Sequence, residues 1–190
     1  MADPPQDAQG FVLWFTGVSG AGKTTLANAV DSVLRRHRRT EILDGDEVRR
    51  YLSAGHGFSK ADRDAHVRRI GFVAALLARN GIATIVAAIS PYAEARGEAR
   101  RLAEVDGTPF VEVGVTAALE TLTLRDSKGL YRRALSGELP NFTGISDPYE
   151  PPTAADLTIC TDDELIPISV EKIFAVLSGR GLLTGGIAGG

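Results

Sequence analysis

A glycine-rich stretch near the N-terminus combines the residue types that hold a phosphate chain. Residues 17–24 read Gly-Val-Ser-Gly-Ala-Gly-Lys-Thr, which matches the pattern G-x-x-x-x-G-K-[ST]. Glycine allows the backbone torsions and close approach that let a loop turn its N–H groups toward an anion. The lysine can bring a mobile charge to the outer phosphates, and the threonine hydroxyl can ligate Mg2+. The stretch indicates a nucleoside triphosphate site, with ATP as the favoured ligand; a plain glycine-rich turn is the alternative.

Two carboxylates follow the second apolar segment. Asp44 and Asp46, within Leu-Asp-Gly-Asp, are expected at the end of the second strand, which in a parallel sheet faces the ligand crevice. Carboxylates beside a triphosphate repel it unless a metal ion or a hydroxyl proton lies between them. One is therefore a candidate to bind the water molecules of a metal ion. The other is a candidate base that takes a proton from the molecule receiving the phosphoryl group, the acceptor. Asp-Gly-Asp also suits a plain turn, and spacing alone leaves both interpretations open.

Arginines are frequent in the next part of the chain, at Arg49, Arg50, Arg63, Arg68 and Arg69. Most of them are expected in solvent, but a guanidinium is a natural fork for a sulfate or phosphate ester. One or two that face the crevice would suit an anionic acceptor. Two aromatic residues, Phe58 and Phe142, lie in polar segments, where they either join a small satellite core or stack on a base.

The bulk composition narrows the class of protein. The chain has 190 residues, 44% hydrophobic and 24% charged, with a net charge of -3, so it suits one globular domain and offers no cationic field for nucleic acid or an anionic membrane. The first ten residues lack the pattern of a signal peptide, and the longest apolar zone, 70–89, is interrupted by Arg-Asn-Gly. Cys160 is the only cysteine, so no intrachain disulfide can form and a cytoplasmic location is expected.

Strands and helices are expected to alternate along the chain. Apolar runs predict strands at 11–17, 41–46, 82–90, 110–115 and 156–161. Helical spacing predicts helices at 23–37, 61–81, 92–107, 116–126 and 167–181, the first with basic residues in its last turn. The strands lack polar alternation, as expected when helices cover both faces of a parallel sheet. The expected fold is therefore α/β, with a parallel sheet flanked by helices on both faces.

Composition also divides the chain into three parts. Residues 1–10 are predicted to be a flexible lead-in, residues 11–178 a single folded domain, and residues 179–190 a flexible glycine-rich tail. Within the domain, residues 127–152 are rich in glycine, proline and charge and have little periodicity, which predicts mostly loop.

Further stretches carry a resemblance to a known family. "LDGDEVR", "GFSKADRDAHVRRIG", "AAISPY" and "RDSKGLYRRALSGELPNFTGISDPYEPP" follow the phosphate loop in this order. Together they resemble the adenylyl-sulfate kinase (adenosine 5'-phosphosulfate kinase) family from about residue 11 to about residue 177. Many nucleotide-binding proteins share the phosphate loop, whereas "ISPY" and the segment from "KGLY" to "DPYE" are far more specific.

The resemblance implies a P-loop, nucleoside-kinase-like fold and a reaction in sulfate assimilation. ATP, with Mg2+, would donate its γ-phosphoryl group to the 3'-hydroxyl of adenosine 5'-phosphosulfate, giving 3'-phosphoadenosine 5'-phosphosulfate and ADP. The implied ATP site comprises Gly17, Ser19, Gly20, Ala21, Gly22, Lys23, Thr24, Thr25, Arg125 and Cys160. The implied acceptor site comprises Asp46, Arg49, Phe58, Arg63, His66, Ile89, Ser90, Lys128, Asn141 and Phe142, with the two phenylalanines on either side of the acceptor's adenine.

The implied catalytic residues are Lys23, Asp44, Asp46, Ser90 and Lys128, with Thr24 and Asp44 at the metal. Asp46 would align the 3'-hydroxyl and take its proton late, while Asp44 would order metal-bound water. A lid over about 126–152 would close, exclude water and bring the Lys128 charge to the transferring group. Direct in-line transfer is favoured over a phosphoserine at Ser90, because a hydroxyl acceptor can attack without a covalent intermediate.

Two positions depart from the family pattern. His66 stands where the family often has asparagine; a histidine can still donate one hydrogen bond, so acceptor binding is expected with an altered pH dependence. Asn141 stands where the family often has glycine before the Phe-Thr-Gly, and asparagine tolerates a left-handed backbone better than most residues, so the turn is expected to survive.

Alternatives to this function stay open at the level of sequence. One is another small-molecule P-loop kinase, acting on gluconate or a nucleoside; another is a regulatory, non-catalytic kinase-like domain of a fused sulfate-activating enzyme. The sequence keeps the residues expected to catalyse transfer, which argues against a domain that has lost its activity: Lys23, Thr24, Asp44, Asp46 and Lys128. The expected partners are the small-molecule acceptor, a second copy in a homodimer, and ATP sulfurylase as a fusion or a separate protein.

Overall fold

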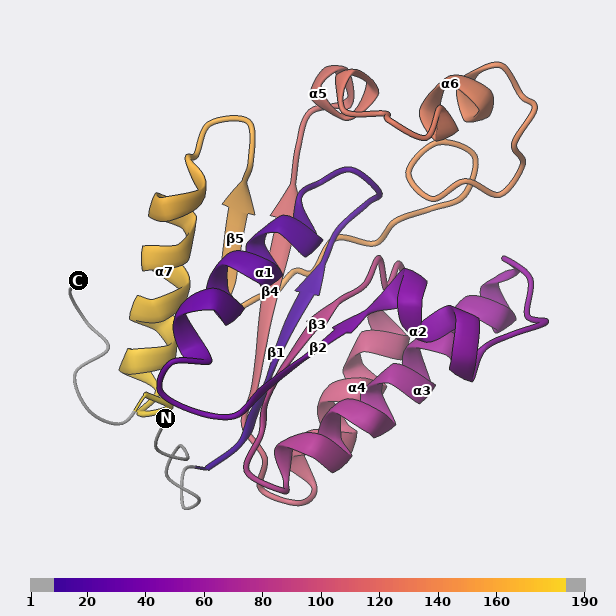
Figure 1. Ribbon diagram of the computed structural model, residues 1–190. Coiled ribbons are helices and arrows are strands. Elements are labelled where there is room, and N and C mark those ends of the chain that lie inside the picture. The colour runs from indigo at the N-terminus through magenta and orange to yellow at the C-terminus, as the bar shows by residue number, and fades with distance from the viewer. Residues whose placement is uncertain (1–8, 184–190) are drawn as a thin grey trace.

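A five-stranded parallel sheet forms the centre of the protein. The computed structural model describes residues 9–183, so most of the predicted lead-in and tail lie outside the described residues (Figure 1). The strands are β1 (Phe11–Thr16), β2 (Thr40–Asp44), β3 (Ala83–Ala87), β4 (Phe110–Thr116) and β5 (Leu157–Cys160). Their order in the sheet is β2-β3-β1-β4-β5, and every neighbouring pair is parallel. The parallel sheet predicted from the unbroken apolar strands is confirmed.

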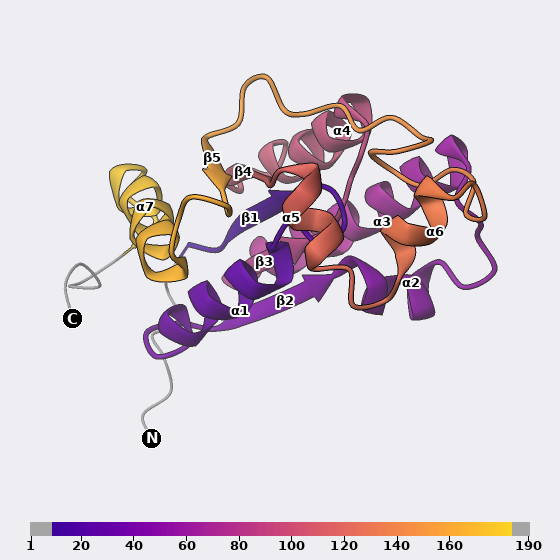
Figure 2. The same ribbon diagram turned by 90° about the horizontal axis from the view of Figure 1, so that it is seen from above.

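Helices cover both faces of this sheet, as Figures 1 and 2 show. They are α1 (Lys23–Leu34), α2 (Gly45–Leu52), α3 (Lys60–Ala78), α4 (Ala93–Glu104), α5 (Leu119–Leu124), α6 (Leu130–Leu135) and α7 (Ile166–Gly179). One face packs against α1 and α7, and the other against α3 and α4. In Figure 1, α5 and α6 lie above the carboxyl ends of the strands.

The central strand β1 supplies side chains to two separate hydrophobic cores. Phe11, Leu13 and Phe15 pack toward α1 and α7, whereas Val12 and Trp14 pack toward α3 and α4. Successive side chains of a strand point to opposite faces, so a strand with a helical layer on each side is apolar at every position. This burial fixes the carboxyl end of β1, from which the phosphate loop leaves the sheet.

Three expectations about secondary structure need correction. The strand predicted over 41–46 ends at Asp44, and α2 begins at Gly45, because the Asp44 side chain accepts hydrogen bonds from the N–H groups at the start of that helix. The helix predicted over 23–37 ends at Leu34, so its basic residues lie beyond the last turn. The segment expected to be mostly loop contains α6. N–H groups in the first turn of this helix donate to the Asp126 carboxylate. The starts of α2 and α6 each depend on a single carboxylate, Asp44 or Asp126, which is a weaker signal than periodicity.

Within residues 9–183, the longest helices are too short or too polar to cross a lipid bilayer.

Candidate active site

The phosphate loop joins β1 to α1 and depends on its glycines. A Cβ atom at Gly17 would lie 2.3 Å from the carbonyl oxygen of Val115, so no side chain fits there. Gly20 and Gly22 have φ angles of 76° and 102°, in the region that favours glycine. Helix α1 then begins at Lys23, and its free N–H groups make the start of this helix suitable for an anion.

Lys23 is held inside this loop. Its Nζ donates to the carbonyl oxygen of Val18 at 2.8 Å, and the residue is only 8% exposed. Burial lowers the pKa of the Lys23 ammonium to about 8, although the carboxylates of Asp46 and Asp44 act in the opposite direction. The group is therefore mostly charged at neutral pH and points into a poorly solvated site, where a phosphate would be a strong partner.

Asp44 connects the start of α1 to the start of α2. Its Oδ2 accepts from the Thr24 hydroxyl at 2.8 Å, and its Oδ1 accepts from the N–H of Asp46 at 2.9 Å. One carboxylate therefore contacts the first turn of α1 and positions α2, which carries Asp46. Hydroxyl and carboxylate oxygens are the ligands that Mg2+ prefers. Within the described residues no group of three or more His, Cys, Asp or Glu is arranged to hold a metal ion.

A cavity of about 270 Å³ brings most of the expected site residues together. Those that line it are Ser19, Gly20, Lys23, Thr24, Asp44, Asp46, Arg49, Phe58, Arg63, His66, Ile89, Ser90, Arg125 and Lys128. Lys128 Nζ lies 3.4 Å from Asp46 Oδ2, and the two side chains are 69% and 77% exposed. Because both groups keep most of their contact with solvent, this pair is weak and can open for a substrate.

A second cavity of about 470 Å³ adjoins the first along the phosphate loop. Gly22, Thr25 and Arg125 line it together with Thr161, Glu164 and Ile166. The Arg125 guanidinium donates to the Thr161 hydroxyl at 2.8 Å, which fixes its orientation next to the loop. Thr161 and Glu164 were missed at the level of sequence; they follow the end of the last strand, and the rule that ligands bind at the carboxyl ends of parallel strands could have found them.

Five of the expected site residues line neither cavity: Gly17, Ala21, Asn141, Phe142 and Cys160. Ala21 is buried in the core, and Cys160 ends β5 one residue before Thr161. The Phe142 ring packs edge-on against Tyr131, with 5.0 Å between the ring centroids, whereas Phe58 is 60% exposed at the cavity. An adenine held between the two phenylalanines therefore stays a prediction that requires the lid to move.

Arg63 is buried, and its donors are occupied by two residues of the segment 126–152 and by the backbone of Phe58. Its guanidinium donates to the Thr143 hydroxyl at 2.6 Å and to the carbonyl oxygen of Asn141, and its Nε donates to the carbonyl oxygen of Phe58 at 2.8 Å. Most of the five arginines considered from the sequence were expected in solvent, and Arg63, at 7% exposed, is the buried exception among them. Asn141 has a φ of 56°, which confirms that an asparagine sustains the left-handed turn here.

Tyr131 joins the other end of the lid to the phosphate loop. Its hydroxyl donates to the carbonyl oxygen of Ser19 at 2.7 Å, and the residue is 2% exposed. This contact was not predicted, since it joins residues 112 positions apart in the chain. The segment 126–152 is therefore anchored to the phosphate loop through Tyr131 and to the wall of the first cavity through Arg63.

His66 is buried between α2 and α3 and is neutral. Its Nε2 lies 3.1 Å from the carbonyl oxygen of Gly45 and its Nδ1 lies 2.9 Å from the Ser53 hydroxyl, so Nε2 donates and Nδ1 accepts. Burial, assisted by the positive charge of Arg49, lowers the pKa of the His66 imidazole to about 4. The neutral His66 side chain therefore donates a hydrogen bond to the start of α2, next to Asp46, as the side chain of an asparagine could.

We expect His66 to make the protein sensitive to mild acid. The pKa is about 4 in the folded chain against 6.5 for a free imidazole, so the unfolded chain binds an extra proton in this window. The contribution of neutral His66 to stability is fully present above pH 6.5 and is lost as pH drops toward 4. At about pH 5 this loss should lower the free energy of unfolding by about 2 kcal/mol. Urea unfolding at neutral pH and near pH 5 measures it. The variant His66→Asn should lose clearly less, and an equal loss in both proteins would contradict the assignment.

Donor and acceptor features thus face one connected space beneath a lid, at the carboxyl edge of a parallel sheet, which defines the class as a P-loop kinase of small molecules. The family model for adenylylsulphate kinase matches residues 9–160. An adenylyl-sulfate kinase of Myxococcus xanthus is 54% identical over 174 residues, covering 92% of this chain and 94% of that protein. The chain belongs to the adenylyl-sulfate kinase family.

Two further relatives extend the comparison. The structure of the Mycobacterium tuberculosis APS kinase CysC in complex with AMPPNP and APS is 40% identical, with a TM-score of 0.85, and covers 90% of this chain and 99% of that one. A probable bifunctional SAT/APS kinase of Sorangium cellulosum is 51% identical over 173 residues, which cover 90% of this chain but 29% of that protein. The family domain therefore occurs both alone and within a longer protein.

Proposed function

We propose that this protein transfers the γ-phosphoryl group of ATP to the 3'-hydroxyl of adenosine 5'-phosphosulfate, giving 3'-phosphoadenosine 5'-phosphosulfate and ADP. The observation that carries the proposal is the shared cavity. Lys23 and Thr24 from the phosphate loop, Asp46 from α2, and the wall formed by Arg49, Phe58 and Arg63 all face it. Family membership and the relative solved with AMPPNP and APS support the assignment of donor and acceptor.

An acceptor screen tests the proposal directly. The protein is incubated with ATP and Mg2+, and ADP release is followed with adenosine 5'-phosphosulfate, adenosine 5'-monophosphate or gluconate as acceptor. We expect rapid ADP release only with adenosine 5'-phosphosulfate, and chromatography should identify the 3'-phosphorylated product. Transfer to gluconate at a comparable rate, or ADP release that does not depend on any acceptor, would contradict it.

The residues of the cavity divide the work of phosphoryl transfer. The loop N–H groups and Lys23 would balance the charge of the triphosphate. The Thr24 hydroxyl and the Asp44 carboxylate, 2.8 Å apart, would hold Mg2+, directly or through water. When bound, this ion would neutralise charge on the phosphate oxygens. Asp46 would accept a hydrogen bond from the 3'-hydroxyl, align it and take its proton late in the transfer.

The acceptor's negative groups would lie against the arginines of the cavity. Arg49 and Arg63 both lie over the Phe58 ring, with 5.0 and 5.6 Å from guanidinium carbon to ring centroid. A planar guanidinium that stacks on an aromatic ring keeps its edge free for a sulfate or phosphate ester. For Arg63 to contribute, its hydrogen bonds to residues 141 and 143 must yield to the acceptor, so we infer that acceptor binding and lid movement are coupled.

We expect Ser90 to be dispensable for the chemical step. Its hydroxyl accepts from the indole N–H of Trp14 at 3.0 Å and donates to the carbonyl oxygen of Ala88, and the residue is 2% exposed, which favours a structural and positioning role. Ser90→Ala should keep kcat within about tenfold of the wild type and should lower the free energy of unfolding by about 1–3 kcal/mol, since the indole N–H loses its partner. Single-turnover transfer and urea unfolding measure the two effects. Complete loss of transfer with both substrates still bound would instead support a phosphoserine.

We also propose that the protein forms a homodimer in the cytoplasm and acts with an ATP sulfurylase, as a partner or a fused domain. The relative named as a bifunctional SAT/APS kinase supports the fused domain. The use of ATP and the free thiol of Cys160 support the cytoplasmic location. Sedimentation equilibrium of the chain alone tests the dimer, and a monomer at high concentration would contradict it.

A further inference from the structure

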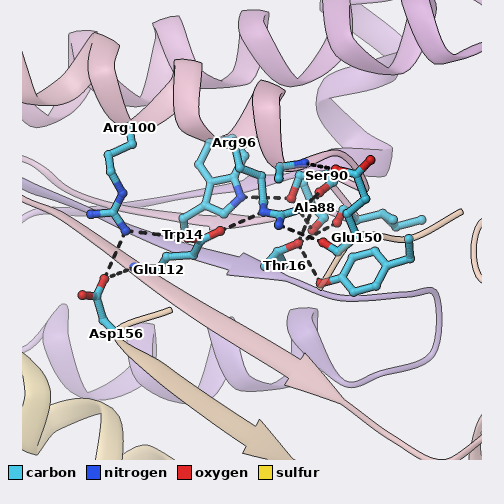
Figure 3. Close-up of polar contacts among 12 residues, drawn as sticks. Trp14, Thr16, Ala88, Ser90, Arg96, Arg100, Glu112, Glu150 and Asp156 are labelled. Atoms are coloured by element: carbon cyan, nitrogen blue, oxygen red, sulfur yellow. Dashed lines mark hydrogen bonds and ion pairs between the residues drawn. The ribbon is translucent and has the colours of Figure 1, made fainter. Parts of the chain in front are cut away.

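Ser90 lies in a turn with a strained backbone at the wall of the acceptor cavity. Its φ of 41° is positive, a conformation that a residue with a side chain adopts only when its surroundings hold it there. The side chain is held by Trp14, as described above. On the backbone side, the Thr16 hydroxyl donates to the carbonyl oxygen of Ile89 at 2.8 Å (Figure 3). The position of Ile89 and Ser90 is therefore imposed by distant contacts.

Arg96 supplies the strongest of these contacts. It closes the first turn of α4, is 3% exposed, and pairs through Nε with Glu112 on β4 at 2.8 Å. One terminal nitrogen of its guanidinium donates to the carbonyl oxygen of Ser90 at 2.8 Å, and the other donates to the carbonyl oxygen of Glu150, also at 2.8 Å (Figure 3). Charge-assisted hydrogen bonds from a buried, planar donor fix both distance and direction.

The second carbonyl marks the point where the lid returns to the body of the protein. The N–H of Glu150 donates to the carbonyl oxygen of Pro91 at 2.8 Å, and the Glu150 carboxylate accepts from the N–H of Ala93 at the start of α4. The preceding residue, Tyr149, places its hydroxyl 3.1 Å from that of Thr16. The C-terminal end of the lid is therefore fastened to the same turn that carries Ser90.

We propose that Arg96 is a positioning residue for the phosphoryl acceptor: it holds the Ile89–Ser90 wall and the C-terminal end of the lid in one fixed arrangement. The inference rests on the proposed function, because it concerns the same acceptor. Arg96 lines neither cavity, although its hydrogen-bond partner Ser90 lines the first one. Its effect therefore passes through the two carbonyl groups, and it acts on the acceptor side of the cavity, away from the phosphate loop.

A neighbouring arginine provides a matched control. Arg100 lies one turn further along α4 and approaches the same Glu112 carboxylate, with 3.6 Å between Nη2 and Oε2. It also pairs with Asp156 and donates to the carbonyl oxygen of Phe110, but among the described residues its hydrogen-bond and ion-pair partners include neither Ser90 nor Glu150 (Figure 3). Loss of Arg100 disturbs the same ion-pair cluster without loosening the acceptor wall or the lid.

The test compares Arg96→Lys with Arg100→Lys. Lysine keeps the positive charge beside Glu112 but cannot donate to Ser90, Glu150 and Glu112 in the same planar geometry. Calorimetric titration gives Kd for adenosine 5'-phosphosulfate alone and for ADP alone, so that no turnover intervenes. For Arg96→Lys we expect Kd for adenosine 5'-phosphosulfate to rise about tenfold or more, with Kd for ADP within about twofold of the wild type. Arg100→Lys should leave both constants near the wild-type values.

Several outcomes would overturn the proposal. The first is an equal rise of Kd for adenosine 5'-phosphosulfate in Arg96→Lys and Arg100→Lys. The second is a rise of Kd for ADP in Arg96→Lys as large as the rise for adenosine 5'-phosphosulfate. The third is an unchanged Kd for adenosine 5'-phosphosulfate in Arg96→Lys. Thermal unfolding and circular dichroism establish that each variant is folded, and Arg96→Gln is the second variant. If neither Arg96 variant folds while Arg100→Lys does, Arg96 is a general stability residue and the proposal is wrong. Turnover by the wild type is measured alongside, so that failure of the proposed function is recognised separately.

Discussion

Replacing Asp46 with asparagine is expected to lower kcat by about 10²- to 10⁴-fold, the usual contribution of a positioned acid or base. Asparagine keeps the size of the side chain but cannot accept the proton of the 3'-hydroxyl. Asp46 lies in the first turn of α2 and lines the cavity together with Lys23 and Thr24. The Asp44 side chain accepts from the N–H of Asp46, so the backbone at this position is held without the charge of the Asp46 side chain.

Steady-state kinetics with both substrates varied measures this effect. The control is Glu47→Gln, which removes a carboxylate from the next position of the same helix; Glu47 is exposed and lines neither cavity. It should keep kcat within about twofold. If Asp46→Asn raised only the KM for adenosine 5'-phosphosulfate and left kcat intact, Asp46 would be a binding residue and its role as base would be wrong.

Replacing Lys23 with methionine is expected to lower kcat/KM for ATP by about 10³-fold or more, because the transferring phosphoryl group loses the preorganised cation in the phosphate loop. Methionine fills a similar volume, so the loss measures charge and hydrogen bonding. The matched control is Lys60→Met, since Lys60 pairs with Asp64 and lines neither cavity. A fall of less than about tenfold in Lys23→Met would contradict the assigned role.

The same lysine gives a pH dependence whose direction follows from its pKa. In the free protein the pKa of Lys23 is lowered to about 8, so the ammonium loses its proton as pH rises through that value. The charged form is the one that attracts the triphosphate, and kcat/KM reports ionisations of the free enzyme. We therefore expect kcat/KM for ATP to be highest below pH 8 and to decline above it. The decline of kcat/KM above pH 8 should be absent in Lys23→Met.

The donor half of the site could be predicted from local sequence. Gly17, Gly20, Gly22, Lys23 and Thr24 lie within eight consecutive residues, 17–24, and the geometry of such a loop and helix start depends on the torsions of these neighbours. The sheet was predictable for a similar reason: strands buried on both faces are apolar at each position, and helices with regular spacing separate them. Both features are properties of neighbours in the chain.

The acceptor half could be predicted only in part. The motifs that resemble the family named Arg63, Ser90 and Phe142, but sequence did not reveal that Arg63 is buried against the lid or that the Ser90 hydroxyl faces Trp14. Nor did it reveal that Phe142 packs on Tyr131, away from the cavity. Helices α2 and α6 were missed because short elements depend on one cap each, Asp44 and Asp126, and carry little periodicity.

By itself, the sequence determined a parallel α/β protein with a phosphate loop, a pair of carboxylates beyond the second strand, and a family of kinases whose motifs follow in order. Only the tertiary structure decided which polar groups are free for a substrate and which are already used by the protein. The contacts that decide it join Trp14 to Ser90, Arg63 to Thr143 and Arg96 to Glu150, at separations of 76, 80 and 54 residues. Such contacts form because the sheet brings distant strand ends to one edge, and no pattern among neighbouring residues records them.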